Sequence, residues 1–73
     1  MNTSGRATLL HDWRLAHGLT LRELAGLTGF SDAYVSRLER GERHLRPLAR
    51  VRFARALGAQ VKELFEAEAG DGS

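Results

Sequence analysis

The chain contains no cysteine, and this absence excludes disulfide bonds and thiolate metal sites. It also lacks any apolar run approaching the roughly 20 residues that a membrane-spanning helix needs. The N-terminal segment, MNTSGRAT, lacks the apolar region of a secretory signal peptide. We therefore expect a cytoplasmic protein without a membrane segment, whose stability comes from helix packing alone.

The residues that could bind a metal ion or carry out catalysis are poorly spaced for either role. No two of the histidines have the i, i+3 or i, i+4 spacing of a helical metal site; they are His11, His17 and His44. Serine, aspartate and histidine are present, but no nucleophile elbow and no glycine-rich phosphate loop accompany them. We expect no metal, no cofactor and no enzymatic activity.

The length and the charge distribution restrict the function further. Seventy-three residues suffice for one small domain, which buries only about 60% of its unfolded surface and has no room for a large enclosed active site. Residues 37–55 contain seven arginines and two glutamates, a local charge of +5, whereas residues 63–73 contain four acidic residues and no basic one. The cationic segment favours a polyanionic partner, although a solvated helix face would explain it equally well.

Residues 19–41 have the pattern of two short helices joined by a tight turn. Thr20 and Glu23 form a Thr-x-x-Glu capping box at the start of the first helix. Ser31 has the position of a second N-cap. Gly29 lies between them, where the first helix must end and the backbone must take a positive φ. This pattern predicts a helix-turn-helix.

Helical spacing of apolar residues continues on both sides of this motif. We expect helices at about residues 6–17, 20–28, 31–40, 47–57 and 60–67, with no strand pattern or repeat between them. The predicted fold class is all-α, a compact five-helix domain. It covers residues 6–67, with a flexible N-terminus at residues 1–5 and a disordered tail at residues 68–73.

The apolar spacing also predicts which side of a helix is buried. In the fourth helix Leu48, Val51, Ala54 and Leu57 form an i, i+3, i+6, i+9 stripe. The arginines between them would mostly face water or a partner. Trp13, alone on the apolar side of the first helix, is expected in the core.

On the side of the third helix that should face away from the core, the side chains are short or polar and include one arginine, as base recognition requires. A helix in the major groove reads base edges with its N-terminal residues; here the candidates are Asp32, Ala33, Ser36 and Arg37. Arg37 can fork onto O6 and N7 of guanine, Ala33 can meet a thymine methyl group, and Ser36 is a versatile but weak reader. Asp32 either accepts from cytosine N4 or, as we favour, complements the positive N-terminus of its helix.

Helix N-termini and flanking cations are suited to holding DNA phosphates. Tyr34 could reach a phosphate or, equally, serve as a partly buried structural residue. The phosphate contacts predicted from these residues are Thr20, Ser31, Tyr34, Arg40, Arg43 and His44.

Several spaced positions together resemble the Cro/CI-type helix-turn-helix, also called the XRE-like domain, of phage repressors and bacterial regulators. The resemblance covers about residues 6–66; the matching residues are Arg14, Gly18, Leu19, Thr20, Glu23, Leu24, Ala25, Gly29, Phe30, Ser31, Val35, Ser36, Glu39, Gly41, Ala54, Ala56, Leu57, Gly58, Glu63, Leu64 and Phe65. It implies a lambda-repressor-like fold and a homodimer on a pseudo-palindromic operator, with half-sites about one helical turn apart. It also implies a structural ion pair between Arg14 and Glu39.

Two departures from the family pattern alter the DNA contacts that the resemblance implies. Leu21 stands where the family commonly has a DNA-contacting glutamine, so that contact is either lost or moved to Arg22. Glu42 stands where the family often has a lysine in the loop after the third helix, and Arg46 becomes a substitute phosphate contact.

These observations predict a sequence-specific regulator of transcription that binds double-stranded DNA, most simply a repressor acting as a dimer. The alternative is a protein-interaction module, such as an antitoxin that binds a toxin or a regulator that contacts RNA polymerase.

Overall fold

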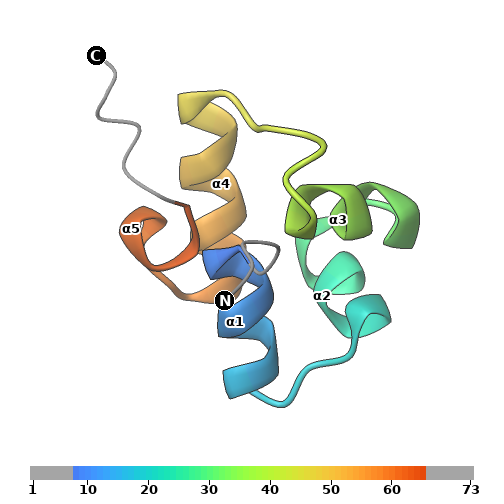
Figure 1. Cartoon of the computed structure of the whole chain (residues 1–73). Coiled ribbons are helices and arrows are strands. Elements are labelled where there is room, and N and C mark those ends of the chain that lie inside the picture. Colours follow the sequence, from blue (N-terminus) through green and yellow to red (C-terminus); the bar gives the residue numbers. More distant parts are fainter. Residues whose placement is uncertain (1–7, 66–73) are drawn as a thin grey trace, which may run out of the picture.

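Five α-helices and no β-strand make up residues 8–65, the part of the chain that the computed structural model describes (Figure 1). They are α1 (Leu9–Ala16), α2 (Leu21–Thr28), α3 (Asp32–Glu39), α4 (Pro47–Leu57) and α5 (Val61–Leu64). The expected all-α, five-helix fold is confirmed. The α2–α3 pair lies on one side of the molecule, and α1, which contacts both α3 and α5, lies with α4 and α5 on the other. Within residues 8–65 no helix is long and apolar enough to cross a membrane.

Side-chain caps determine where the first three helices begin. The hydroxyls of Thr8, Thr20 and Ser31 each accept a hydrogen bond from the backbone N–H three residues later. Around Thr20 the capping box is complete, because the Glu23 carboxylate accepts from the backbone N–H of Thr20 at 2.8 Å. The extended backbone of Thr8 makes α1 begin after it, so the expected start near residue 6 is wrong.

Helices α2 and α5 end where the backbone of the next residue leaves the helical conformation. At the end of α2, Gly29 has the positive φ of 84° that the helix-turn-helix pattern requires, and its N–H donates to the carbonyl of Ala25 at 2.8 Å. The last helix stops earlier than expected, since Phe65 is extended (φ −131°, ψ 137°). The segments predicted as a flexible N-terminus (1–5) and a disordered tail (68–73) lie outside the described residues.

Gly26 and Gly29 offer a matched test of this turn. A Cβ atom at either position would meet nothing within 4 Å, but Gly26 lies inside α2 whereas Gly29 has a left-handed backbone. We expect Gly29→Ala to lower the free energy of unfolding by about 1 to 2 kcal/mol and Gly26→Ala to raise it by up to about 1 kcal/mol. Urea denaturation followed by circular dichroism measures both. Changes of the same sign would contradict the turn geometry.

The core receives side chains from all five helices and from the loop between α3 and α4. The buried apolar residues are Leu10, Leu24, Ala25, Val35, Leu38, Leu45, Phe53, Ala54 and Leu64. Phe53 joins two further rings, with centroids 5.9 Å from Phe30 and 5.7 Å from Phe65. As expected, Trp13 packs against this core, and its ring stacks on that of His17 with centroids 3.9 Å apart.

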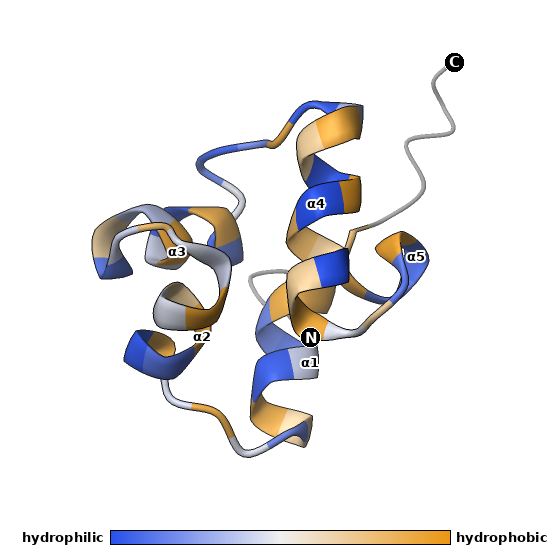
Figure 2. Cartoon of the chain, turned by 180° about the vertical axis from the view of Figure 1, so that it is seen from behind, coloured by the Kyte–Doolittle hydropathy of each residue, from blue (hydrophilic) through white to orange (hydrophobic). Residues whose placement is uncertain are grey.

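The buried side of α4 differs from the predicted stripe. Leu48 and Val51 are 64% and 40% exposed, whereas Phe53 and Ala54 are buried and Leu57 is half-buried. Every turn of α4 carries both hydrophobic and hydrophilic residues (Figure 2), so its hydropathy pattern fits more than one face. Contact with α2 and α5 selects the side that carries the phenylalanine ring. The prediction was therefore wrong for Leu48 and Val51.

The loop between α3 and α4 is anchored to the core. Leu45, at its centre, is only 6% exposed. Nε of Arg50 donates to the carbonyl oxygen of Leu45 at 2.8 Å, and its guanidinium lies 5.9 Å from the centroid of the Phe65 ring. Arg50 is thus a structural residue, unlike Arg52 and Arg55, which are exposed as expected.

Candidate DNA-binding surface

One polar surface covers the outer side of α3, while its inner side is buried in the core. Val35 and Leu38 are 0% and 5% exposed and hold the helix in place. The outer side carries the four predicted base-contact residues, of which three are exposed and Ser36 is half-buried: Asp32, Ala33, Ser36 and Arg37. The structure therefore brings these side chains onto one accessible face. Their contact with DNA stays a prediction.

An ion pair between α2 and α3 borders this surface. Nε of Arg22 lies 3.6 Å from Oδ2 of Asp32, and the two side chains are 89% and 52% exposed. Such an exposed pair contributes little to stability. It adds a further role for Asp32, which also occupies the first turn of α3, where a negative charge is favourable.

The two hydroxyl groups predicted to hold phosphates lie at the N-termini of α2 and α3. Thr20 Oγ1 accepts from the backbone N–H of Glu23 at 3.0 Å, and Ser31 Oγ accepts from that of Tyr34 at 3.1 Å. A hydroxyl group that accepts one hydrogen bond still has a hydrogen to donate. Both groups can therefore serve as caps and as phosphate donors.

The Tyr34 side chain is held by its ring. It is half-buried, and its centroid lies 4.8 Å from that of Phe30, which in turn packs on Phe53. These contacts give the ring a structural role. A phosphate contact by the hydroxyl stays a prediction.

Arg40, predicted as a phosphate contact, already has two partners. Its Nε and Nη2 donate to the two carboxylate oxygens of Glu42 at 3.0 and 3.3 Å, and its Nη1 donates to Ser36 Oγ at 2.9 Å. The hydrogen bond from Arg40, helped by the positive charges of Arg40 and Arg37, lowers the pKa of Glu42. The same hydrogen bond and the negative charge of Glu42 raise the pKa of Arg40. Both groups are therefore ionised at neutral pH.

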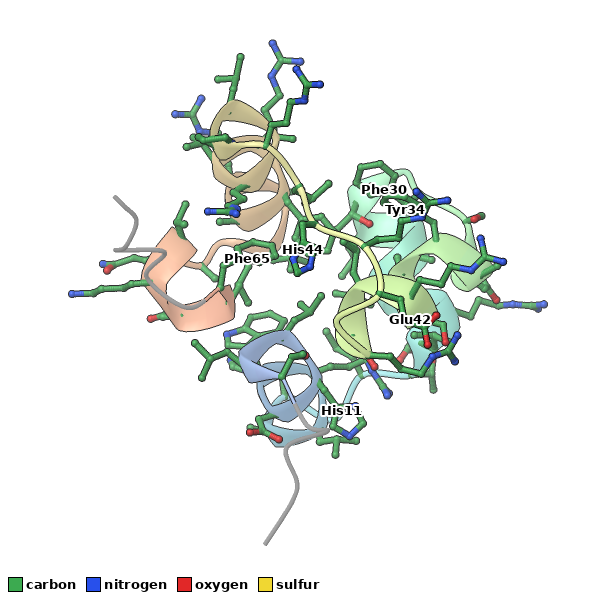
Figure 3. The ribbon with its side chains drawn as sticks, turned by 45° about the horizontal axis from the view of Figure 1, so that its top comes forward. His11, Phe30, Tyr34, Glu42, His44 and Phe65 are labelled. Carbon is green, nitrogen blue, oxygen red and sulfur yellow. The ribbon has the colours of Figure 1, made fainter. Side chains whose placement is uncertain are left out.

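The remaining predicted phosphate contacts follow α3 in the loop to α4. Arg43, His44 and Arg46 are all exposed, on either side of the buried Leu45. Figure 3 shows Glu42 at the end of α3 and His44 farther along the same loop. The anchored leucine restrains the loop that carries these side chains, from the end of α3 to the N-cap of α4.

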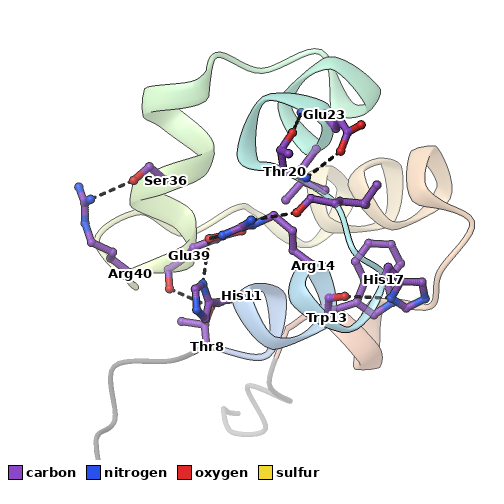
Figure 4. A network of polar contacts seen from close by, with 12 residues as sticks. Thr8, His11, Trp13, Arg14, His17, Thr20, Glu23, Ser36, Glu39 and Arg40 are labelled. Atoms are coloured by element: carbon purple, nitrogen blue, oxygen red, sulfur yellow. Dashed lines mark hydrogen bonds and ion pairs between the residues drawn. The ribbon is translucent and has the colours of Figure 1, made fainter.

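Glu39 connects the end of α3 to α1 (Figure 4). Its carboxylate accepts from Arg14 Nε at 2.6 Å and Nη2 at 3.1 Å, and its side chain is only 6% exposed. Arg14 also donates to the carbonyl of Leu19 at 3.0 Å. The ion pair implied by the family resemblance is thus present, and it fixes the position of the polar surface of α3 relative to α1.

Two members of this network were missed at the level of sequence. His11 Nδ1 lies 3.1 Å from a Glu39 carboxylate oxygen, and Thr8 Oγ1 donates to the backbone carbonyl of Glu39 at 2.9 Å. His11 precedes Arg14 by three residues and so shares its side of α1, which is the pattern that could have identified it. No spacing pattern in the sequence links the Thr8 hydroxyl to the backbone carbonyl of Glu39.

Leu21 packs against the core and is partly buried. The residue that replaces the glutamine of the family pattern therefore has a structural role. Among residues 8–65 there is also no group of three or more histidine, cysteine, aspartate or glutamate side chains that could hold a metal ion.

Comparisons with known proteins agree with this architecture. A family model described as a helix-turn-helix domain matches residues 7–67. The restriction-modification controller protein C.AhdI from Aeromonas hydrophila is 37% identical, with a TM-score of 0.68, over 78% of this chain and 86% of that one. The clp gene regulator ClgR from C. glutamicum is 35% identical, with a TM-score of 0.70, over 89% of this chain and 84% of that one. No curated protein matched the chain.

The family match spans most of the chain, and both structural relatives exceed 30% identity over more than three quarters of it. The capped α2–α3 pair with its glycine turn forms the helix-turn-helix, and in proteins with this motif the second helix carries the base contacts. The chain therefore belongs to the Cro/CI-type, XRE-like helix-turn-helix family and is a DNA-binding domain of the kind found in transcriptional regulators.

Proposed function

We propose that the protein is a sequence-specific repressor that binds a pseudo-palindromic operator as a homodimer, with α3 in the major groove. It would act in the cytoplasm, where its DNA target would lie. The observation that carries the proposal is the outer side of α3, where Ala33, Ser36 and Arg37 are accessible on a helix fixed by its buried side. Arg43 and Arg46, exposed in the loop after α3, supply positive charge for the phosphates, and the exposed His44 ring between them offers a hydrogen bond. The two structural relatives are by name a controller protein and a gene regulator, which supports a regulatory role.

Selection of bound sequences from a random double-stranded DNA library tests this function. We expect an enriched motif with two inverted half-sites whose centres lie about 10 base pairs apart, or a multiple of that spacing. Sedimentation of the complex should give two chains per motif. Enrichment of a single, non-repeated half-site would contradict the dimeric part of the proposal, and enrichment of nothing would contradict specific DNA binding.

Base recognition by Arg37 is tested with Arg37→Ala on the selected motif. A bidentate contact with guanine contributes about 1 to 3 kcal/mol of discrimination, so we expect a comparable loss of affinity for the motif and little change for non-specific DNA. Fluorescence anisotropy at fixed salt concentration measures both affinities.

Arg55→Ala is the matched control, because it removes the same charge from an exposed position on α4. It should affect the two DNAs equally and slightly. An equal loss on both DNAs from Arg37→Ala would show that Arg37 contacts a phosphate rather than a base.

The alternative is a protein-interaction module that binds a toxin or RNA polymerase. The exposed Leu48 and Val51 on α4 are the observation that favours it, because they provide apolar surface away from α3. A stoichiometric complex with one purified partner of either kind would support this alternative. Turnover of a substrate by the purified domain is expected under neither proposal.

A further inference from the structure

The Arg40 guanidinium lies over the polar surface of α3, although its Cα is at the C-terminal end of that helix. Arg40 is the C-cap residue, and its Nη1 reaches back one turn to donate to Ser36 Oγ at 2.9 Å (Figure 4). Helical side chains lean toward the N-terminus, which makes this contact possible. The guanidinium is thus displaced toward the residues predicted to contact bases.

The backbone turn after α3 brings Glu42 to the other side of the same guanidinium. Gly41 has a φ of 78°, its N–H donates to the Leu38 carbonyl, and the N–H of Glu42 donates to the Arg37 carbonyl at 2.9 Å. This is the hydrogen-bond pattern of a Schellman motif, which folds the chain back against the helix end. The carboxylate of Glu42 then accepts from both Nε and Nη2 of Arg40 at 3.0 and 3.3 Å.

These contacts use three of the five N–H groups of Arg40 and leave one on each terminal nitrogen. The side chain remains 57% exposed, so the two remaining groups are accessible. Two N–H groups on neighbouring nitrogens suit the O6 and N7 acceptors of guanine. A phosphate, in contrast, is attracted mainly by net positive charge, which Glu42 cancels here, and it would be repelled by the adjacent carboxylate.

We infer that Arg40 reads a base of the operator and that Glu42 positions its guanidinium for that contact, in place of the phosphate contact expected from the sequence. This inference rests on the proposed function. It makes Glu42 a determinant of specificity, although its charge opposes binding to DNA in general.

The first test replaces Arg40 by lysine, which keeps the charge but cannot fork onto guanine. Affinities are measured by fluorescence anisotropy for the selected motif, its single-base variants and non-specific DNA. We expect Arg40→Lys to lose about 5- to 150-fold discrimination at one base pair, while non-specific affinity changes little. Arg55→Lys, at an exposed position on α4 outside the predicted DNA contacts, is the matched control and should leave every base preference unchanged.

The second test replaces Glu42 by glutamine. We expect discrimination to fall at the same base pair as in Arg40→Lys, while non-specific affinity stays equal or rises because a negative charge is removed. Asp12→Asn, which removes one exposed negative charge from α1, controls for charge alone. Circular dichroism of each variant establishes that the helical fold is retained.

The results separate this inference from the function on which it rests. Unchanged base preferences in Arg40→Lys, together with an equal loss on all DNAs and a salt slope smaller by about 1 in Arg40→Ala, would assign Arg40 to a phosphate and overturn the inference alone. An equal gain on all DNAs in Glu42→Gln and Asp12→Asn would overturn the role of Glu42. If the wild-type protein enriches no sequence, the proposed function and this inference both fail.

Discussion

Glu39→Ala is expected to lower the free energy of unfolding by about 3 kcal/mol or more, because it leaves the guanidinium of Arg14 without its carboxylate partner in a largely buried position. The Arg14 and Glu39 side chains are only 14% and 6% exposed, and His11 lies against the same carboxylate. A domain of this size has a total stability of roughly 4 to 11 kcal/mol. The variant should therefore melt at least about 12 °C lower, as measured by thermal and urea denaturation.

A double variant distinguishes the loss of one partner from the loss of the pair. Arg14→Met with Glu39→Met replaces both charges by apolar side chains, and such replacements of a buried pair are often close to neutral. We expect the double variant to be more stable than Glu39→Ala. If Glu39→Ala costs less than about 1 kcal/mol, the ion pair does not secure α3 to α1.

Phe53→Ala is expected to cost about 3 to 5 kcal/mol, the range for removing a large buried aromatic side chain. Phe53 is 2% exposed and lies between the rings of Phe30 and Phe65. Its loss would open a cavity between α4, the α2–α3 turn that carries Phe30 and the end of α5 that carries Phe65. Urea denaturation provides the measurement, and a fall in the cooperativity of unfolding would accompany the loss of stability.

Leu48→Ala is the matched control for this prediction, because it removes a large apolar side chain from an exposed position on the same helix. Its effect on stability should stay within about 0.5 kcal/mol. Comparable losses of stability from Leu48→Ala and Phe53→Ala would indicate that α4 buries the apolar stripe expected from the sequence, and would contradict the structure.

The residues of the polar surface on α3 could be chosen from the sequence, but their interactions could not. Asp32, Ala33, Ser36 and Arg37 share one side because helical geometry repeats every 3.6 residues. Arg40 was included only as a cation. Its pairing with Glu42 depends on the turn at Gly41, which brings a residue beyond the helix back beside the helix end.

Local interactions determined what the sequence could reveal: the N-caps Thr20 and Ser31, the glycine turn and the resulting helix-turn-helix all depend on residues a few positions apart. The tertiary structure alone decided which side of α4 is buried, why Leu45 and Arg50 are structural, and how His11 and Thr8 reach Glu39. The contacts of His11 and Thr8 with Glu39, and that of Arg50 with the Phe65 ring, join residues distant along the chain. A helix whose amphipathic pattern would allow several sides to be buried takes one orientation only when the neighbouring helices are in place.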